Sequence, residues 1–384
     1  MQYVRDNAAY LEFGLHGVGH EHWEDGVRKR AEWYDLKGDK PWPEQDGRDH
    51  LALFARIMAQ YGWTPENGQS FPESFVPCAN AIHWNPNGET STGKLMAEAG
   101  VKYANTDFSY IPEAKPPIRF GGGFDHGLLV IHRKNYGNPW FALGALPTAK
   151  HSKFATDVIE AHWTNLLAQD YFLQSRVTDR WVALFQKIRA RPDRYLAKNT
   201  EQFSSQWLYR RYAKLSETGS GRVEIDNTRM PEQAYAPDFL GNLVLAIRLP
   251  EGSHVSKATL DGESIPATLE QDGFGYLYLP PLERKSYRFE YEVGTGRLEP
   301  VVRHSGTYNV YSLRAGGDTL RIDLEMYGTQ VVEVTSNAPA KAVRSLEENL
   351  QVIGYDHDAD AKLIRITLSG RDMQGERGVI EISR

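Results

Sequence analysis

The spacing of apolar residues divides the chain into two parts. In several segments of the first part, apolar side chains recur every three to four positions, which predicts amphipathic helices with one buried face. These helices are expected at residues 49–61, 94–99, 179–189 and 202–215. Short apolar runs between them predict strands at residues 10–16, 101–104, 128–131 and 158–161. Alternation of helices and strands is typical of an α/β barrel or a doubly wound sheet.

After about residue 216 the pattern changes to short strand-like runs, some with clean apolar–polar alternation. Strands are expected at residues 243–247, 276–279, 287–291, 320–324, 331–334 and 363–368. Turn residues separate them at intervals typical of a β-sandwich. All nine tryptophans of the chain precede this change. We therefore predict an α/β domain, either a barrel or a doubly wound sheet, over residues 1–215, a linker at 216–221, and one or two β-sandwich modules, with bounds of 222–296 and 297–384 if there are two.

Composition narrows the class of protein further. The net charge is −6 and the basic residues are scattered, so neither a nucleic-acid footprint nor a polybasic membrane anchor is indicated. The sequence has no run of about 18 apolar residues, so we expect no membrane-spanning helix. Cys78 is the only cysteine, which excludes an internal disulfide and a multi-cysteine metal site. Residues 1–10 lack the apolar core of a signal peptide, and a predicted strand follows at once; we expect the sequence to begin inside a longer gene product.

Two histidines four positions apart, His16 and His20, stand in the segment LHGVGHEHW that begins at Leu15. The two glycines between them disfavour a helix, so we expect a strand that ends at His16 and a tight loop that returns His20 to the same point. Two neutral imidazoles placed in this way bind zinc or a similar divalent cation. Such an ion makes hydroxide available at neutral pH. The alternative is a histidine-rich loop that is packed by hydrogen bonds.

The segment from Phe75 to Trp84 leads into a loop and is expected at the mouth of a barrel. Its side chains suit a sugar, because Asn80 or His83 would hydrogen-bond the substrate and Trp84 would stack on a sugar face. The alternative is an ordinary transition from strand to loop.

A histidine also follows the apolar strand predicted at residues 158–161. Active sites of α/β barrels gather at the carboxyl ends of strands, where His162 would act as a general acid that protonates a leaving group. The alternative is a histidine that caps the strand. Further residues that would line the substrate cleft are Asp125, His126, His132, Arg133, Trp163 and Asn165.

Taken in order, these segments resemble the NodB-like polysaccharide deacetylases, and more closely their larger, divergent bacterial relatives, over about residues 8–190. In that family a strand-end histidine and a second histidine four residues later bind the metal, and His16 and His20 match them. A late strand of the barrel supplies a histidine as general acid, and His162 stands at a similar position. The segment Phe75 to Asn80 is similar to the proline-containing strand end of the family.

The resemblance implies a distorted, incomplete (β/α)7-type barrel, followed here by the all-β sandwich region. It implies a hydrolase that uses a divalent metal, zinc in the first place, to remove an N- or O-acetyl group from a polysaccharide or oligosaccharide. A tetrahedral oxyanion would form, and His162 would protonate the departing amine or alcohol. An extracytoplasmic location follows from the resemblance only.

The chain departs from the family pattern in two places. It has no pair of aspartates, of which the family uses one as a metal ligand and the other as the general base. Ser74, Phe75 and Val76 occupy the stretch where the family has an arginine. A sequence that begins inside a longer gene product would explain the missing aspartates, and so would a degenerate domain without catalysis.

Two other classes of function stay open. A carbohydrate-binding protein without turnover, on a degenerate deacetylase barrel, agrees with the missing base and the tryptophan-rich first part. A glycoside hydrolase needs two carboxylates about 5 to 10 Å apart. Glu21, Asp125 and Glu160 are available for that role, yet their spacing singles out no pair.

Overall fold

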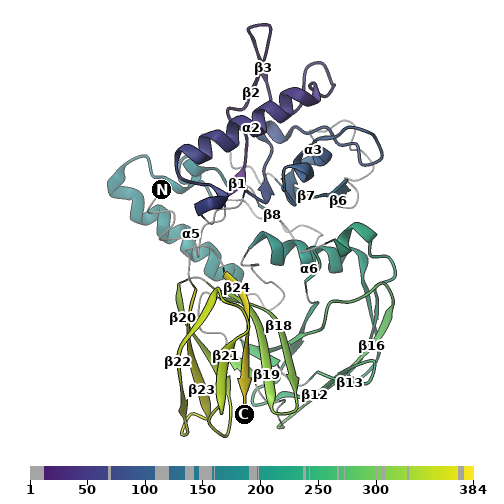
Figure 1. Ribbon diagram of the computed structural model, residues 1–384, viewed down its shortest axis with the longest axis vertical. Helices are drawn as coiled ribbons and strands as arrows, with labels where there is room; N and C mark the ends of the chain where they lie inside the picture. The colour runs from purple at the N-terminus through teal and green to yellow at the C-terminus, as the bar shows by residue number, and fades with distance from the viewer. Residues whose placement is uncertain are drawn as a thin grey trace. The chain divides into compact units, whose positions relative to one another are not determined.

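The computed structural model of the chain (Figure 1) divides into two units, Phe13–Thr200 and Glu201–Arg384. The residues that it describes are 13–67, 71–108, 121–134, 142–146, 158–159, 161–189, 197, 199–236, 239–241, 243–265, 268–271, 273–296, 298, 301–303, 308–326, 328–370 and 376–384. Among them, no helix has the length and apolar character that crossing a membrane requires.

A six-stranded sheet forms the centre of the described part of the first unit. Its parallel strands are β1 (Gly14–Leu15), β4 (Ser74–Phe75), β5 (Tyr103–Thr106), β7 (Leu128–Lys134) and β8 (Val158–Ile159). The short strand β6 (Gly122–Asp125) pairs with β7 in the antiparallel direction. The prediction of an α/β fold with a parallel sheet is therefore confirmed. Since parallel strands share their direction, their carboxyl ends meet at one edge of the sheet.

Helices α2 (Glu44–Gln60) and α3 (Thr92–Glu98) pack against each other in the first unit (Figure 1). Gly47 permits this contact, because a Cβ atom there would lie 2.5 Å from a methyl carbon of Leu95. Helix α2 begins at Glu44, earlier than the apolar pattern predicts. Its first turn carries Glu44 and Asp46, whose negative charges suit the amino end of a helix.

Helix α5 (Gln174–Arg189) also begins earlier than predicted. Thr178 directly precedes the predicted start at residue 179, where a threonine could cap a helix. In the structure its hydroxyl instead donates a hydrogen bond of 3.1 Å to the Gln174 carbonyl inside the helix. The turn before the helix is capped instead by Asp170, whose side chain accepts from the Phe172 N–H. Threonine forms either bond, so its position alone did not fix the start of the helix.

The second unit begins with helix α6 (Thr200–Tyr212), which ends where β9 (Lys214–Gly219) begins. Residues 216–221, expected to be a linker, belong to β9 and to its turn into β10 (Arg222–Asp226). Gly221 has a φ of +67°, a conformation that glycine adopts without strain. The glycine- and serine-rich composition that suggested a linker is equally that of a hairpin turn.

Apart from α6 and a short 3-10 helix at Glu232–Tyr235, the described part of the second unit consists of strands and their connections, and it contains three sheets (Figure 1). Their strand orders are β13-β12-β16-β10-β9, β11-β15-β14-β17-β20-β23-β22 and β18-β19-β24-β21. The bounds of the remaining strands are β11 Val244–Arg248, β12 His254–Leu260, β13 Glu263–Ser264, β14 Thr268–Gln271, β15 Phe274–Tyr278, β16 Ser286–Gly294, β17 Val301–Arg303, β18 Tyr308–Gly316, β19 Thr319–Met326, β20 Thr329–Thr335, β21 Ala342–Ser345, β22 Leu350–Asp358, β23 Leu363–Gly370 and β24 Glu376–Ser383.

The modules predicted at 222–296 and 297–384 share one sheet. Strand β14 pairs in parallel with β17, with Leu269 opposite Val302, and this pair joins the strands of both segments. Leu269 and Val302 also belong to one apolar core, to which the four-stranded sheet contributes Ile322. Pairing of β14 with β17 satisfies backbone groups at strand edges that would otherwise be open. The apolar–polar alternation within a strand does not indicate which other strand will pair with it.

Candidate functional site

His16 and His20 face each other at the carboxyl edge of the parallel sheet. His16 directly follows β1, and the loop reverses through Gly17, with a φ of +139°, and His20, with a φ of +64°. The two Nε2 atoms lie 2.5 Å apart, and the ring centroids lie 4.5 Å apart. Both side chains keep exposed surface, so the point on which they converge is accessible from solvent.

The orientation of the His16 ring is set by the neighbouring strand. Its Nδ1 atom lies 2.6 Å from the carbonyl oxygen of Val76, which directly follows β4. With Nδ1–H donating to that carbonyl, the neutral ring has its lone pair on Nε2, toward His20. Burial of the ring lowers the pKa of His16. The hydrogen bond to Val76 raises the pKa in part, whereas the charges of His20 and Arg133 lower it further. The site thus favours the neutral imidazole, which is the form that binds a metal.

A buried carboxylate, Glu32, lies under the loop between the two histidines. Its side chain is 0% exposed and accepts hydrogen bonds from the backbone N–H groups of Val18, at 2.8 Å, and Gly19, at 3.2 Å. The Nδ1 atom of His50 in α2 lies 2.9 Å from the same carboxylate. Burial raises the pKa of Glu32, but these bonds outweigh burial and hold it below its usual range.

Glu32 is not among the site residues that the sequence predicts. Its only signal in the sequence is that it is the one acidic residue in the otherwise apolar run Ala31 to Tyr34, whose other side chains are all buried. A charge in such a run needs a partner. The sequence does not name that partner, because His50 and the loop are brought to Glu32 only by folding.

Arg133, at the end of β7, is buried and lies close enough to His16 to influence its pKa. Its Nε and one terminal nitrogen lie 3.1 Å and 2.5 Å from Oδ1 of Asn80. The same oxygen accepts from the N–H of Asp107, which directly follows β5. Asn80 was predicted to bind substrate, whereas in the structure its side-chain oxygen holds a guanidinium at the edge of the sheet.

His162 follows β8, which is parallel to β7, so the residue belongs to the same edge of the sheet as His16. Its backbone N–H donates a hydrogen bond of 2.7 Å to Oδ1 of Asn165. Asn165 is fully buried and also donates to the carbonyl of Ala142, so its amide holds this turn. Trp163 is 74% exposed and presents its ring to solvent. Glu160 lies outside the described residues.

Trp84 and His83 lie in surroundings different from those predicted. Trp84 is 7% exposed and packs in the apolar core with its ring edge-on to Phe108, at 5.2 Å between centroids, so it has no free face for a sugar. The ring of His83 stacks over Tyr34 at 6.3 Å, and its backbone N–H donates to the hydroxyl of Thr92.

Asp125 lies at the wrong edge of the sheet for the predicted role. Strand β6 runs antiparallel to β7 and pairs Asp125 with Leu128, the first residue of β7. The parallel strands begin at that edge, whereas His16 stands where they end. Asp125 is also fully buried, and burial raises the pKa of its carboxyl. Glu21 is in β2 (Glu21–Glu24) and forms an ion pair with Arg28 in β3 (Val27–Arg30).

The donor set at the histidine edge matches part of a metal site. Two imidazoles with converging Nε2 atoms provide two ligands for a divalent cation of the zinc class. Within the described ranges, no group of three histidine, cysteine, aspartate or glutamate side chains forms a complete site. The histidine pair by itself would supply two of the ligands that such a cation takes.

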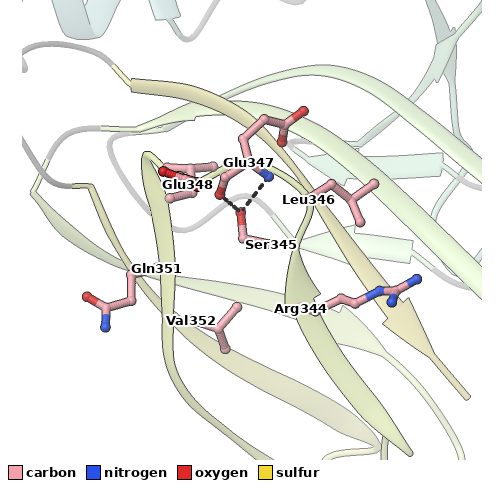
Figure 2. Close-up of a pocket in the computed structure, with 8 residues that line it drawn as sticks. Arg344, Ser345, Leu346, Glu347, Glu348, Gln351 and Val352 are labelled. Carbon is pink, nitrogen blue, oxygen red and sulfur yellow. Dashed lines mark hydrogen bonds between the residues drawn. The ribbon is translucent and has the colours of Figure 1, made fainter.

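A hollow between β21 and β22 in the second unit offers less chemistry (Figure 2). It is lined by one loop and the adjoining strand residues, among them Arg344, Glu347 and Gln351. The Ser345 hydroxyl is bound within that loop, since it donates to the Glu347 carbonyl at 2.8 Å (Figure 2). The histidine edge of the first unit is therefore the better candidate site. No protein-family model, curated protein or solved structure matches the chain.

Proposed function

We propose that the first unit is a metal-dependent carbohydrate deacetylase domain, built on a distorted, incomplete (β/α)7-type barrel. The observation that carries this proposal is the 2.5 Å approach of the Nε2 atoms of His16 and His20. Their position at the carboxyl edge of a parallel sheet is where α/β enzymes keep their active sites. The bond from His16 to Val76 supports the same role, because metal-binding histidines usually donate their other N–H to a carbonyl or carboxylate.

The proposed reaction is hydrolysis of an N- or O-acetyl group on a polysaccharide or oligosaccharide. A divalent cation, zinc in the first place, would supply a Lewis acid that acidifies water and polarises the acyl carbonyl. His16 and His20 would hold it through Nε2. His162 would donate a proton to the departing amine or alcohol. The positive charge of Arg133 favours the neutral form of His16 and adds to a field that stabilises an oxyanion.

The test is metal content and acetate release on the full chain. We expect zinc to bind at one equivalent, and binding to be lost in a His16→Ala/His20→Ala double variant. A matched control is His254→Ala, which removes a histidine paired with Glu270 in the second unit and leaves zinc bound. Equal zinc content in the double variant would reject the site. Acetate release from acetylated oligosaccharides that depends on zinc and on His162 would support turnover.

The second candidate is carbohydrate binding without turnover. The 74% exposure of the Trp163 ring favours it, because exposed aromatic faces are suited to stacking on sugar rings. Oligosaccharide binding by metal-free protein, unchanged in the His16→Ala/His20→Ala variant and without acetate release, would favour this candidate over the deacetylase.

A further inference from the structure

The loop that carries the histidine pair folds around one carboxylate. The two oxygens of Glu32 accept from consecutive backbone N–H groups, those of Val18 and Gly19. Gly17 approaches so closely that a Cβ atom there would lie 2.0 Å from Oε2 of Glu32. The loop has no regular secondary structure, so the carboxylate takes the place of the partners that a helix or sheet would give these N–H groups.

The residues on either side of Glu32 hold the two ends of the same loop. The N–H of Ala31 donates to the carbonyl of His20 at 3.0 Å. The indole N–H of Trp33 donates to the carbonyl of His16 at 3.2 Å. The three consecutive residues Ala31, Glu32 and Trp33 therefore bind both histidine carbonyls and two of the three N–H groups between the histidines.

Glu32 is itself held in place. Its own N–H donates to the sulfur of the buried Cys78, at 3.2 Å, and its carboxylate contacts His50 of α2. One helical turn before His50, the carboxylate of Asp46 lies 3.4 Å from Nε2 of His22. His22 is in β2, the strand that follows the loop. Helix α2 thus fixes the carboxylate and the start of β2 with residues on one face.

We propose that Glu32 is a positioning residue of the divalent-cation site, which presets the loop so that the Nε2 atoms of His16 and His20 face a common point before an ion binds. This inference rests on the proposed function. A loop with glycines at 17 and 19 has many accessible backbone conformations. If the ion had to order this loop on binding, the lost conformational entropy would lower the affinity of the site for the ion. The carboxylate removes that cost during folding.

The experiment compares cobalt binding by the full chain, freed of metal with a chelator, in the native protein and in Glu32→Gln. The amide keeps the shape of the side chain but loses the charge and replaces one acceptor oxygen with a donor. We expect the affinity for Co²⁺ to fall about 10- to 100-fold, as for other residues that orient metal ligands. The visible absorption spectrum of the bound Co²⁺ should change as well, because the ligand geometry is no longer fixed.

The matched control is Glu381→Gln. Glu381 is another buried carboxylate, bonded to Arg321 and Arg344 in the second unit, and its loss should leave Co²⁺ affinity and spectrum unchanged. If Glu32→Gln does not fold, Glu32→Asp tests the same point, since the shorter side chain cannot reach both N–H groups.

The outcomes separate the two proposals. A native protein that binds no Co²⁺ or Zn²⁺ rejects the proposed function. A native protein that binds, together with a folded Glu32 variant of equal affinity and identical spectrum, rejects the positioning role and leaves the metal site standing. Reduced affinity in each Glu32 variant that folds, with Glu381→Gln unaffected, supports the positioning role.

Discussion

The Nδ1 atom of His50 lies 2.9 Å from Oε1 of Glu32, and this pair joins helix α2 to the loop between His16 and His20. The hydrogen bond to Glu32 raises the pKa of His50 above its ordinary value of 6.5. Burial raises the pKa of Glu32, but the bonds from His50, Val18 and Gly19 outweigh it, and the pKa stays below the ordinary 4.5.

These shifts predict a window of pH in which the pair stabilises the fold. The raised pKa of His50 contributes stability that is complete below pH 6.5 and is lost as the pH rises through the folded-state value. The lowered pKa of Glu32 contributes stability that is present above pH 4.5 and is lost as the pH falls through the folded-state value. His50→Gln should therefore reduce the free energy of unfolding most between those limits, by about 1–3 kcal/mol. Urea unfolding at several pH values measures this; a difference that does not vary with pH would contradict it.

Gly17→Ala should destabilise the first unit. A Cβ atom there would lie 2.0 Å from Oε2 of Glu32, and the φ of +139° is strained for any side chain. We expect a loss of at least about 1–3 kcal/mol in urea unfolding. Gly19→Ala is the matched control, because nothing lies within 4 Å of its Cβ position and its φ is not positive; its effect should stay within about 0.5 kcal/mol. Equal effects of the two substitutions would refute the close approach.

The charge of Arg133 should hold down the pKa of His16. In metal-free protein, titration of His16 by NMR should give a pKa below 6.5. Arg133→Met removes a positive charge that lowers this pKa, so the value should move upward. Arg133→Lys keeps the charge and should move it less. An unchanged pKa in Arg133→Met would show that the two residues are not coupled.

Cys78 should be unreactive in the folded protein. Its side chain is fully buried, and burial raises the pKa of the thiol to about 11, so almost no thiolate forms at neutral pH. A thiol reagent such as dithionitrobenzoate should label one equivalent only after unfolding in guanidinium. Rapid labelling of the native protein at pH 7.5 would contradict the buried position under the Glu32 N–H.

Trp163→Ala should separate binding from stability. The ring is 74% exposed, so its removal should change the free energy of unfolding by no more than about 0.5 kcal/mol. If the ring stacks on a sugar, affinity for oligosaccharides should fall several-fold in equilibrium binding by calorimetry. Trp84→Phe is the contrasting variant, since Trp84 packs in the core and its loss should act on stability instead. Unchanged affinity in Trp163→Ala would remove this residue from the proposed site.

Local pattern predicted many of the elements but not all of their ends. The apolar period placed α2 and α5, yet both begin earlier than expected. The first turn of α2 carries Glu44 and Asp46, and α5 opens with the polar residues Gln174 to Arg176, so the apolar period does not mark either start. The strands at 128–131 and 363–368 were found because their apolar residues are continuous or alternate. The pairing of β14 with β17 was not predicted, because the sequence of a strand does not specify which strand pairs with its edge.

The sequence by itself determined that His16 and His20 share a loop, since two glycines within four residues disfavour a helix and permit a tight return. It also determined the parallel α/β character of the first unit through its alternating helix and strand periods. Only the tertiary structure decided that Glu32 fills the centre of that loop, that Arg133 lies near His16, and that Asp125 stands at the opposite edge. The reason is that local sequence encodes backbone freedom and the period of burial, whereas contacts between distant residues follow from the packing of the whole unit.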